Sequence, residues 1–252
     1  MKRFDTNNNG RPDGRPAGKA KAQRVAAMFA RISRRYDLLN TIMTAGVDDR
    51  WRRLAARLAT GGLSPGLALD VATGTGDLAF ALARRPEVTS VAGIDFVPEM
   101  LVLARHKEQR LHPKAPIIWT LGDAMALPYQ DNSFMCVTSG FAMRNVSDIG
   151  RTLSEMARVV RPGGRVVILE ITPADRKRLG SRLLSAYFSK VVPRLGGLLA
   201  GDRDAYTYLP DSVIGFPAAP ELARIMENAG LTNVRWRLLG AGLIALHTGE
   251  VV

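Results

Sequence analysis

Two glycines lie in a turn between an apolar run and a helical pattern. The stretch 69–78 reads LDVATGTGDL and places Gly74 and Gly76 at this bend. Glycine has no Cβ, so the chain can turn sharply and a ligand can approach the backbone and the helix N-terminus. Asp95 closes the next apolar run, about twenty residues further on, where its carboxylate can accept hydrogen bonds from a ribose diol. The spacing predicts a site for a ribose-containing ligand.

Two further carboxylates are expected at neighbouring strand ends. Asp70 closes the apolar run before the glycine turn, and Asp123 follows a third apolar run, with Ala124 beside it. Each of these aspartates, taken alone, could be a cap or turn residue. Three acidic side chains at the carboxyl ends of successive parallel strands, however, converge on the crevice where open α/β sheets bind ligands. Asp123 could contact an adenine amino group there.

The elements that must position these residues follow from the hydrophobic pattern. From Leu67 onward, short apolar runs alternate with helical segments, which is typical of a parallel sheet covered on both faces. The predicted strands are 67–72, 90–94, 117–120, 134–139, 165–170, 233–239 and 243–248. The predicted helices between them are 77–83, 98–110, 149–160 and 220–229. Pro162, Gly163 and Gly164 are expected to end the fourth helix and to turn into the fifth strand.

The chain is expected to form one domain behind a short tail. Residues 1–20 are rich in Asn, Gly, Pro, Arg and Lys and lack the apolar segment of a secretory signal, so we expect a basic disordered tail. Residues 21–252 would form the domain, with an N-terminal helical segment at 21–60 and a lid-like insertion at 179–211. No apolar stretch approaches the roughly 20 residues that cross a bilayer. We expect a cytoplasmic protein.

The net charge and the single cysteine restrict the possible partners and chemistry only in part. The net charge of +12 favours anionic partners such as nucleic acid, membrane headgroups or phosphates, although a solvated basic surface explains it equally well. The single cysteine, Cys136, cannot form an intramolecular disulfide, and its apolar surroundings favour a buried strand residue over a nucleophile. No His and Cys spacing indicates a metal site.

The glycine turn alone leaves two cofactor classes open. Gly74, Gly76 and Ala79 satisfy the dinucleotide fingerprint G-x-G-x-x-A, which would suit a nicotinamide or flavin dehydrogenase. Three other features resemble class I S-adenosylmethionine-dependent methyltransferases: GDA at 122–124, RPGG at 161–164 and a terminal pair of apolar strands. That resemblance implies a Rossmann-like α/β fold, with a mostly parallel sheet of seven strands and N-terminal helices.

A narrower resemblance extends over residues 21–250. The chain is similar to the ubiquinone and menaquinone biosynthesis C-methyltransferases in YDLLN at 36–40, the helix around Trp51, GTGD at 74–77, ALPY at 126–129, RNV at 144–146, PGG at 162–164, YTYL at 206–209 and AGLIALH at 241–247. The resemblance implies methyl transfer from S-adenosylmethionine to a ring carbon of a prenylated quinol, either demethylmenaquinol or its ubiquinone-pathway equivalent. It also places cofactor contacts at Thr75, Asp95, Asp123 and Ala124, beside Asp70, Gly74 and Gly76.

The chain departs from this family pattern at two positions. The family often has serine where this chain has Gly140, so a side-chain contact to the cofactor would be missing there. Asp48 stands where relatives can carry histidine, which leaves no clear base at that position.

Three residues are our catalytic candidates. Arg144 follows the fourth predicted strand, and its fixed charge could stabilise a phenolate-like oxygen as the methyl group is transferred. A guanidinium stays protonated in proteins, which argues against proton abstraction by this residue. Asn145 could orient the same oxygen or a water, and Tyr36 could reach the substrate from the N-terminal helices. The alternative for Arg144 is a surface ion pair, and the alternative for Tyr36 is a packing role with one hydrogen bond.

The quinol tail resides in a bilayer, so the enzyme is expected to meet its substrate at the inner membrane face. Basic clusters near Arg50 or Arg176 would favour anionic headgroups, while residues 179–199 would shelter the tail. We expect no nucleic-acid partner, and a homodimer stays open. The alternatives are a methyltransferase of sterols or other lipids, a nucleic-acid methyltransferase, and a noncatalytic cofactor-binding module.

Overall fold

The computed structural model describes residues 46–173 and 212–252, together with residues 18, 21, 23–31, 33 and 44. The predicted insertion at 179–211, Tyr36, Arg176 and all of the tail at 1–20 except residue 18 lie outside the described residues. The division into tail, domain and insertion therefore stays a prediction.

A seven-stranded sheet forms the centre of the described chain, with the strand order β3-β2-β1-β4-β5-β7-β6. The strands are β1 (Gly66–Val71), β2 (Val88–Asp95), β3 (Ile117–Leu121), β4 (Phe134–Gly140), β5 (Val160–Ile171), β6 (Thr232–Leu239) and β7 (Ile244–Glu250). β1 to β5 pair in parallel, and β7 runs antiparallel to both β5 and β6. The predicted mostly parallel sheet with a reversed pair at one edge is confirmed.

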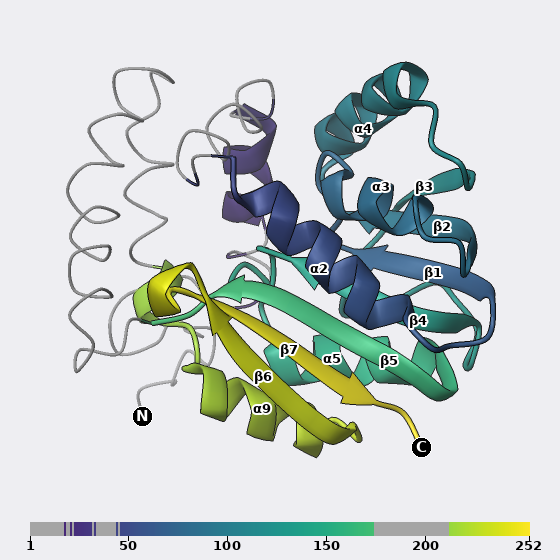
Figure 1. The fold of residues 1–252 in the computed structure, drawn as a ribbon. Helices are drawn as coiled ribbons and strands as arrows, with labels where there is room; N and C mark the ends of the chain where they lie inside the picture. The colour runs from purple at the N-terminus through teal and green to yellow at the C-terminus, as the bar shows by residue number, and fades with distance from the viewer. Residues whose placement is uncertain are drawn as a thin grey trace, which may run out of the picture.

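Helices cover both faces of this sheet. They are α2 (Asp48–Thr60), α3 (Asp77–Ala83), α4 (Pro98–Leu111), α5 (Ile149–Val159) and α9 (Ala219–Asn228). α2 passes in front of the sheet and α5 behind it (Figure 1). Alternate residues of β5 serve the two faces: Val167 packs with the cluster that includes α2 and α3, and Ile168 packs with the cluster that includes α5 and α9. This two-sided burial explains the nearly continuous apolar strands.

Two helix starts have local causes that the sequence indicates. α4 begins at Pro98, where the missing backbone donor would be unpaired in any case. α5 begins at Ile149 because the Asp148 carboxylate accepts a hydrogen bond of 2.9 Å from the backbone N–H of Arg151. Both starts agree with the predicted positions.

The prediction for Pro162, Gly163 and Gly164 is wrong in one respect. These residues do not form a turn before the fifth strand, because β5 already begins at Val160 and includes them. The register between β4 and β5 shifts between Phe134 and Cys136, opposite this stretch. A Cβ on Gly164 would lie 2.6 Å from the carbonyl oxygen of Met135, so close strand approach explains this glycine better than a turn does.

The strand order reverses between β1 and β4. β2 and β3 extend the sheet on one side of β1, and β5 extends it on the other side of β4. In such sheets the crevice at the reversal point, beyond the carboxyl ends of the strands, is the usual ligand site. No helix among the described residues is both long and apolar enough to cross a bilayer.

Candidate active site

A pocket opens at the carboxyl ends of β1, β2, β3 and β4. It encloses about 1070 Å³, counting the part open to solvent, which is ample for a small-molecule ligand. Its walls come from the segments that follow the four strands: 70–78 after β1, 95–100 after β2, 123–125 after β3 and 140–147 after β4. Phe29 and Arg52 complete it from the N-terminal segment and α2. The pocket therefore lies where the strand order reverses.

The turn after β1 needs its glycines for different reasons. Gly74 and Gly76 have φ angles of 56° and 88°, in the left-handed region that favours glycine. A Cβ on Gly76 would lie 2.5 Å from the ring of Trp119, whereas one on Gly74 would meet no protein atom within 4 Å. Gly76 is thus required by packing. Gly74 leaves room for a ligand beside the backbone.

Asp95 joins this turn to the end of β2. Its Oδ2 accepts a hydrogen bond of 2.7 Å from the Gly74 N–H, and its Oδ1 accepts one of 2.9 Å from the Val97 N–H. Burial raises the pKa of the carboxyl, against the lowering effect of these backbone hydrogen bonds. Asp95 lines the pocket, so the same carboxylate fixes the turn and remains near the position expected for a ribose.

Asp70 is buried at the end of β1, with 1% of its surface exposed, yet it borders the pocket. Its two oxygens accept hydrogen bonds from the hydroxyls of Thr73, at 2.6 Å, and Thr138, at 2.7 Å. Burial nevertheless raises its pKa to about 6. The carboxylate therefore holds the glycine turn against β4 in addition to its predicted role towards the cofactor.

Two non-glycine residues at strand ends adopt left-handed backbone conformations. Ala72, after β1, has a φ of 54°, and Phe141, after β4, has a φ of 58°. Such conformations cost on the order of 1 kcal/mol or more and persist where the surrounding structure fixes them. Both residues line the pocket. Strain at adjacent strand ends is consistent with a functional site.

The loop between β3 and β4 brings Asp123, Ala124 and Met125 to the pocket. Asp123 is exposed, and its Oδ1 accepts a 2.9 Å hydrogen bond from the Met125 N–H. The aspartate side chain thus also shapes the backbone beside it. Asp123 lines the pocket, and its contact with adenine remains a prediction.

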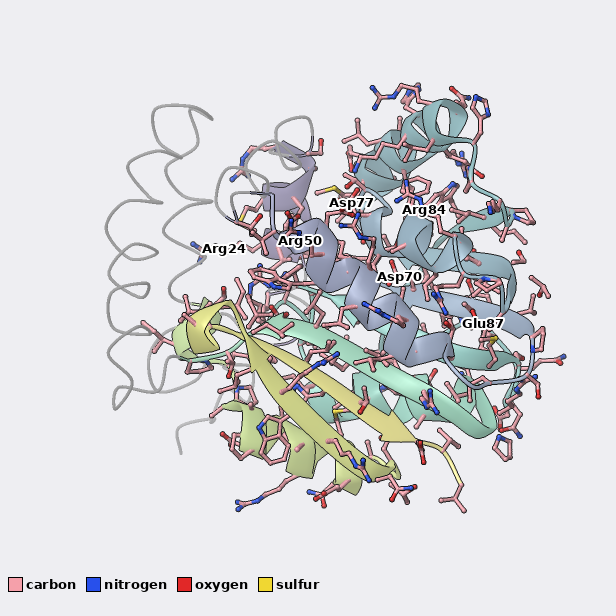
Figure 2. The ribbon with its side chains drawn as sticks, in the orientation of Figure 1. Arg24, Arg50, Asp70, Asp77, Arg84 and Glu87 are labelled. Carbon is pink, nitrogen blue, oxygen red and sulfur yellow. The ribbon has the colours of Figure 1, made fainter. Side chains whose placement is uncertain are left out.

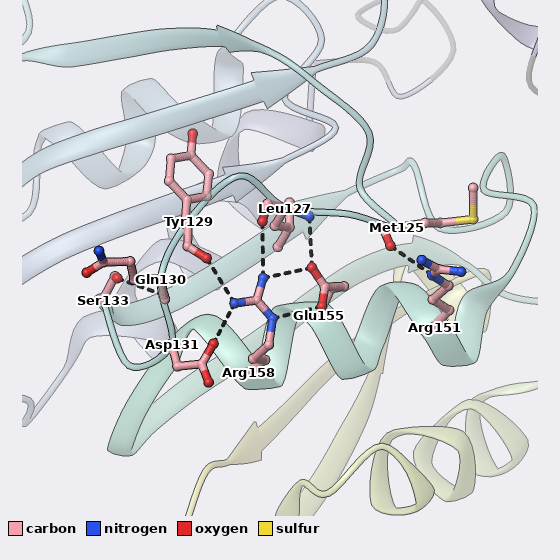
Figure 3. A network of polar contacts seen from close by, with 9 residues as sticks. All are labelled: Met125, Leu127, Tyr129, Gln130, Asp131, Ser133, Arg151, Glu155 and Arg158. Carbon is pink, nitrogen blue, oxygen red and sulfur yellow. Dashed lines mark hydrogen bonds and ion pairs between the residues drawn. The ribbon is translucent and has the colours of Figure 1, made fainter.

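Side chains of α5 hold the rest of this loop in place (Figure 3). The Arg158 guanidinium donates to the carbonyl oxygens of Leu127, at 3.1 Å, and Tyr129, at 2.9 Å. It also pairs with Asp131 at 2.6 Å and with Glu155 at 2.8 Å. These hydrogen bonds from Arg158 hold the pKa of Glu155 below its usual range. Glu155 in turn accepts from the Leu127 N–H.

The loop after β4 carries Arg144 and Asn145. Asn145 lines the pocket, as do Phe141, Ala142 and Val146. The Arg144 guanidinium is not part of the pocket lining: its NH1 lies 2.6 Å from Oε1 of Glu170 and donates to the Phe141 carbonyl oxygen at 2.6 Å. The Arg144 side chain is 8% exposed and that of Glu170 is 1% exposed. Glu170 was not predicted as a site residue, because its acidic side chain stands within the apolar residues of a strand.

The N-terminal segment reaches the same loop. Lys21 Nζ donates to the Val146 carbonyl oxygen at 2.6 Å, and Ser147 Oγ donates to that of Gly18 at 2.9 Å. Residues 23–31 are helical, and Phe29 lines the pocket. The described part of this segment thus lies beside the site, as the sequence predicts. Tyr36 falls outside the described residues.

Arg52 is the pocket residue that the sequence analysis overlooked most clearly. Arg52 belongs to the basic cluster near Arg50, but its side chain is only 9% exposed and forms an ion pair with Asp48. A signal was present. Arg52 falls at helical spacing with the apolar Ala55, Ala56 and Ala59, and an arginine on the buried face of a helix is rare.

The side chains of Cys136 and His247 are structural. Burial raises the pKa of Cys136 to about 12, so its thiol is not nucleophilic at neutral pH. His247 is fully buried, its Nε2 lies 2.9 Å from the Ala219 carbonyl oxygen, and burial lowers its pKa. No group of residues in the described ranges could hold a metal ion.

The donors and acceptors of this pocket suit an adenosine-linked amino acid. The carboxylates at the ends of β2 and β3 can accept hydrogen bonds from a diol and an amino group, and the space beside Gly74 is free of protein atoms. The fit to S-adenosylmethionine rests on these features. The loop after β4 also lines the pocket, where the Asn145 amide is available to a second ligand.

Comparison with known proteins places the chain among close relatives. The model of the ubiE/COQ5 methyltransferase family matches residues 17–251. A demethylmenaquinone methyltransferase of Deinococcus radiodurans is 45% identical over 91% of this chain and 93% of that protein. The corresponding enzyme of Thermus thermophilus is 44% identical, over 88% of this chain and 99% of that protein. A ubiquinone/menaquinone biosynthesis C-methyltransferase of Geobacter sulfurreducens is 41% identical, over 91% of this chain and 89% of that protein.

Solved structures share the fold at lower identity. The [4+2]-cyclase SpnF superposes with a TM-score of 0.67 at 18% identity, over 94% of this chain and 98% of that chain. A SAM-dependent methyltransferase from Aquifex aeolicus gives a TM-score of 0.60 at 18% identity, over 86% of this chain and 98% of that chain. These likenesses support the predicted Rossmann-like fold.

The burial of Asp70 predicts a specific pH dependence of stability. A folded-state pKa of about 6, raised from roughly 3.9 in an unfolded chain, means that the folded protein binds the proton more tightly. The contribution of Asp70 to stability is therefore complete below pH 4 and is lost as the pH rises through 6. The total change is about 3 kcal/mol.

Denaturant unfolding of the wild-type protein and of Asp70→Asn between pH 4 and pH 7 checks this. Relative to Asp70→Asn, the wild-type protein should lose stability as the pH rises across this interval. Other titrating groups are common to both proteins and cancel in the difference. A difference in unfolding free energy that stays constant over the interval contradicts the prediction.

The network around Arg158 predicts an effect on cofactor binding from outside the pocket. Arg158→Ala removes the hydrogen bonds to the Leu127 and Tyr129 carbonyl oxygens, so the loop that carries Asp123 should lose its fixed position. We expect S-adenosylhomocysteine to bind about tenfold more weakly by calorimetry, equivalent to about 1.4 kcal/mol. Arg224→Ala, at an exposed position on α9, serves as the control. Unchanged affinity together with a lowered melting temperature would limit Arg158 to a purely structural role.

Proposed function

Because the chain belongs to the ubiE/COQ5 methyltransferase family, we propose that it methylates a ring carbon of a prenylated quinol, with demethylmenaquinol as the first candidate. The family model covers residues 17–251, and relatives named for demethylmenaquinone are 45% and 44% identical to this chain. The observation that carries the proposal is a pocket between the predicted cofactor-binding strand ends and the loop with Asn145. The ubiquinone-pathway equivalent is the second candidate, since a relative named for both pathways is 41% identical.

The match to this family confirms the resemblance and the enzyme class that were predicted from the sequence. It also bears out S-adenosylmethionine as the cofactor and removes the dehydrogenase alternative. The predicted site residues are a separate matter, since their roles rest on position alone. We keep them as proposals.

We propose that residues at the carboxyl ends of β1, β2 and β3 bind the cofactor. Gly74, Thr75 and Gly76 would leave space and backbone donors for the amino-acid part, with Asp70 fixing their turn. Asp95 would accept hydrogen bonds from the ribose hydroxyls. Asp123 and Ala124 would contact the adenine. A Cβ on Gly140 would lie only 3.2 Å from Leu78, so the serine common in the family would need Leu78 to shift here.

The sulfonium of S-adenosylmethionine supplies an already activated methyl group. The protein must therefore align the ring carbon and keep electron density on it. Asn145 lines the pocket, and its amide could hydrogen-bond to a quinol oxygen and so orient the ring. Water in the open part of the pocket could carry the released proton away.

Arg144 stays our candidate for stabilising the charge that develops on that oxygen. Its guanidinium is buried beside Asn145 and held rigidly by Glu170 and the Phe141 carbonyl oxygen. A fixed charge needs no reorganisation during the reaction, which is the condition for electrostatic catalysis. The pair with Glu170 also gives Arg144 a positioning role, because it anchors the loop that supplies Phe141 and Asn145 to the pocket. Tyr36 remains a further candidate.

The proposal is tested with labelled S-adenosylmethionine and a panel of reduced, demethylated quinones with isoprenoid tails. We expect label in a ring methyl group of demethylmenaquinol, identified by mass spectrometry. In Arg144→Gln, kcat should fall about 100- to 1000-fold, a far larger effect than any loss of affinity for S-adenosylhomocysteine. Arg84→Gln, at an exposed position after α3, should be unchanged. Label in RNA or a sterol, and none in any quinol, would overturn the substrate assignment.

We also propose that the enzyme approaches its substrate along an anionic membrane surface. Arg50 lies at the start of α2 (Figure 2), and Arg53 and Arg57 follow at spacings that place all three on one helix face. All three side chains are exposed. Each cation near an anionic bilayer contributes about 1 kcal/mol, so the stripe could supply useful attraction. The apolar segment at 179–199, proposed to shelter the tail, lies outside the described residues.

Vesicle flotation tests this second proposal. Binding should increase with the fraction of anionic lipid and should fall about 10- to 100-fold when Arg50, Arg53 and Arg57 are all changed to Gln. A triple variant at exposed positions elsewhere, Arg84, Arg105 and Arg110 to Gln, removes the same charge and should retain binding. Equal loss in the two variants, or no dependence on anionic lipid, would refute the α2 surface.

A further inference from the structure

The charges that face the pocket are unequal in number. Among the described lining residues four are aspartates and one is a cation: Asp70, Asp77, Asp95, Asp123 and Arg52. The excess of negative charge suits a ligand that carries positive groups. Arg52 is the one cation among these described lining residues, so it is the side chain that an anionic part of the ligand would meet.

Arg52 is held by its neighbours in the pocket wall. Its NH1 pairs with Asp48, one turn earlier on α2, and its guanidinium lies over the ring of Phe141 at 5.4 Å from the ring centre. The stacking and the ion pair fix the plane of the guanidinium, which favours a directed contact with a carboxylate. A solvated arginine would lack this order.

Asp77 does not neutralise Arg52 fully. Its Oδ2 lies 3.7 Å from Arg52 NH2, whereas its Oδ1 lies 2.6 Å from Lys107 Nζ. Lys107 also donates to the Thr75 hydroxyl at 2.9 Å. Lys107 is therefore the nearer partner of Asp77. A ligand carboxylate at Arg52 would not have to displace a hydrogen-bonded partner at Asp77.

The position of Arg52 identifies the part of the ligand concerned. Asp95 and Asp123 line the pocket at β2 and after β3, and the proposed function assigns them to ribose and adenine. Arg52 instead contacts Asp77 at the start of α3 and Phe141 after β4. The group furthest from the adenine in the methyl donor is the amino-acid end, which carries one carboxylate.

We propose that Arg52 is the binding residue for the α-carboxylate of the methyl donor and that Asp48 is its positioning residue. This inference rests on the proposed cofactor site and adds a residue to it. Burial alone would raise the pKa of Asp48, but the Arg52 charge and the hydrogen bonds from Thr44 and Arg52 outweigh it and lower the pKa. Asp48 thus stays ionised beside Arg52 and keeps the guanidinium in the wall.

The first experiment uses the wild-type protein and three ligands in calorimetry. These are S-adenosylhomocysteine, its analogue without the carboxylate, and 5′-methylthioadenosine, which lacks the whole amino-acid end. Loss of a charge-assisted contact should weaken the analogue on the order of 10- to 100-fold relative to S-adenosylhomocysteine. Equal affinity of these two ligands overturns the inference. If neither of them binds, the cofactor site itself is wrong.

The second experiment compares Arg52→Gln with Arg53→Gln. Arg53 lies one residue further on the same helix and forms an ion pair of the same spacing with Asp49, but its side chain is 51% exposed. Arg52→Gln should weaken S-adenosylhomocysteine on the order of 10- to 100-fold and leave 5′-methylthioadenosine unchanged, while Arg53→Gln should affect neither. Equal weakening of both ligands by Arg52→Gln would mean a structural role and would overturn the inference.

Two further variants keep the test decisive if Arg52→Gln does not fold. Arg52→Lys retains the charge but loses the planar fork, so we expect a smaller loss, about 3- to 10-fold, again confined to S-adenosylhomocysteine. Asp48→Asn should give a loss of similar size because the guanidinium is less firmly held, with Asp49→Asn as its control. An Asp48→Asn or Arg52→Lys protein that binds S-adenosylhomocysteine as the wild type does contradicts the assigned roles.

Discussion

The hydrogen bond from the Gly74 N–H to the Asp95 carboxylate is the contact on which the site depends. It ties the turn after β1 to the end of β2, and the second oxygen of Asp95 holds the backbone at Val97. Asp70 completes the arrangement from the other side through Thr73 and Thr138. Buried carboxylates are costly unless they are hydrogen-bonded. These contacts therefore explain why acidic side chains are tolerated at the carboxyl ends of the apolar strands.

Buried ion pairs connect the site to the elements around it. Arg144 with Glu170 anchors the loop after β4 to β5, and Arg52 with Asp48 stiffens the first turn of α2 where it meets the pocket. Such pairs are weak evidence for stability, because desolvation offsets much of the attraction. Their benefit is geometric, since each pair fixes the position of a charged group beside the pocket.

Structural similarity at low sequence identity shows the fold of this chain, whereas the family match shows its enzyme class. The solved structure of a [4+2]-cyclase shares the fold at 18% identity, so the architecture alone does not determine the reaction. The family match over residues 17–251 determines the enzyme class, because it includes the segments that surround the pocket as well as those that build the sheet. The substrate must then be argued from the loop after β4 and from the relatives at 45% and 44% identity.

The sheet, the glycine turn and the carboxylates at the strand ends could be predicted from the sequence, because periodicity and strand-end position are local properties of the chain. The prediction of a turn at 162–164 was wrong, because these residues belong to β5 and pack closely against β4, which is distant in the sequence. Only the tertiary structure showed that Arg144 faces Glu170 and that Arg52 faces the pocket. The reason is physical: the partner of a long charged side chain is set by packing between segments far apart in the sequence, which letters and spacing do not encode.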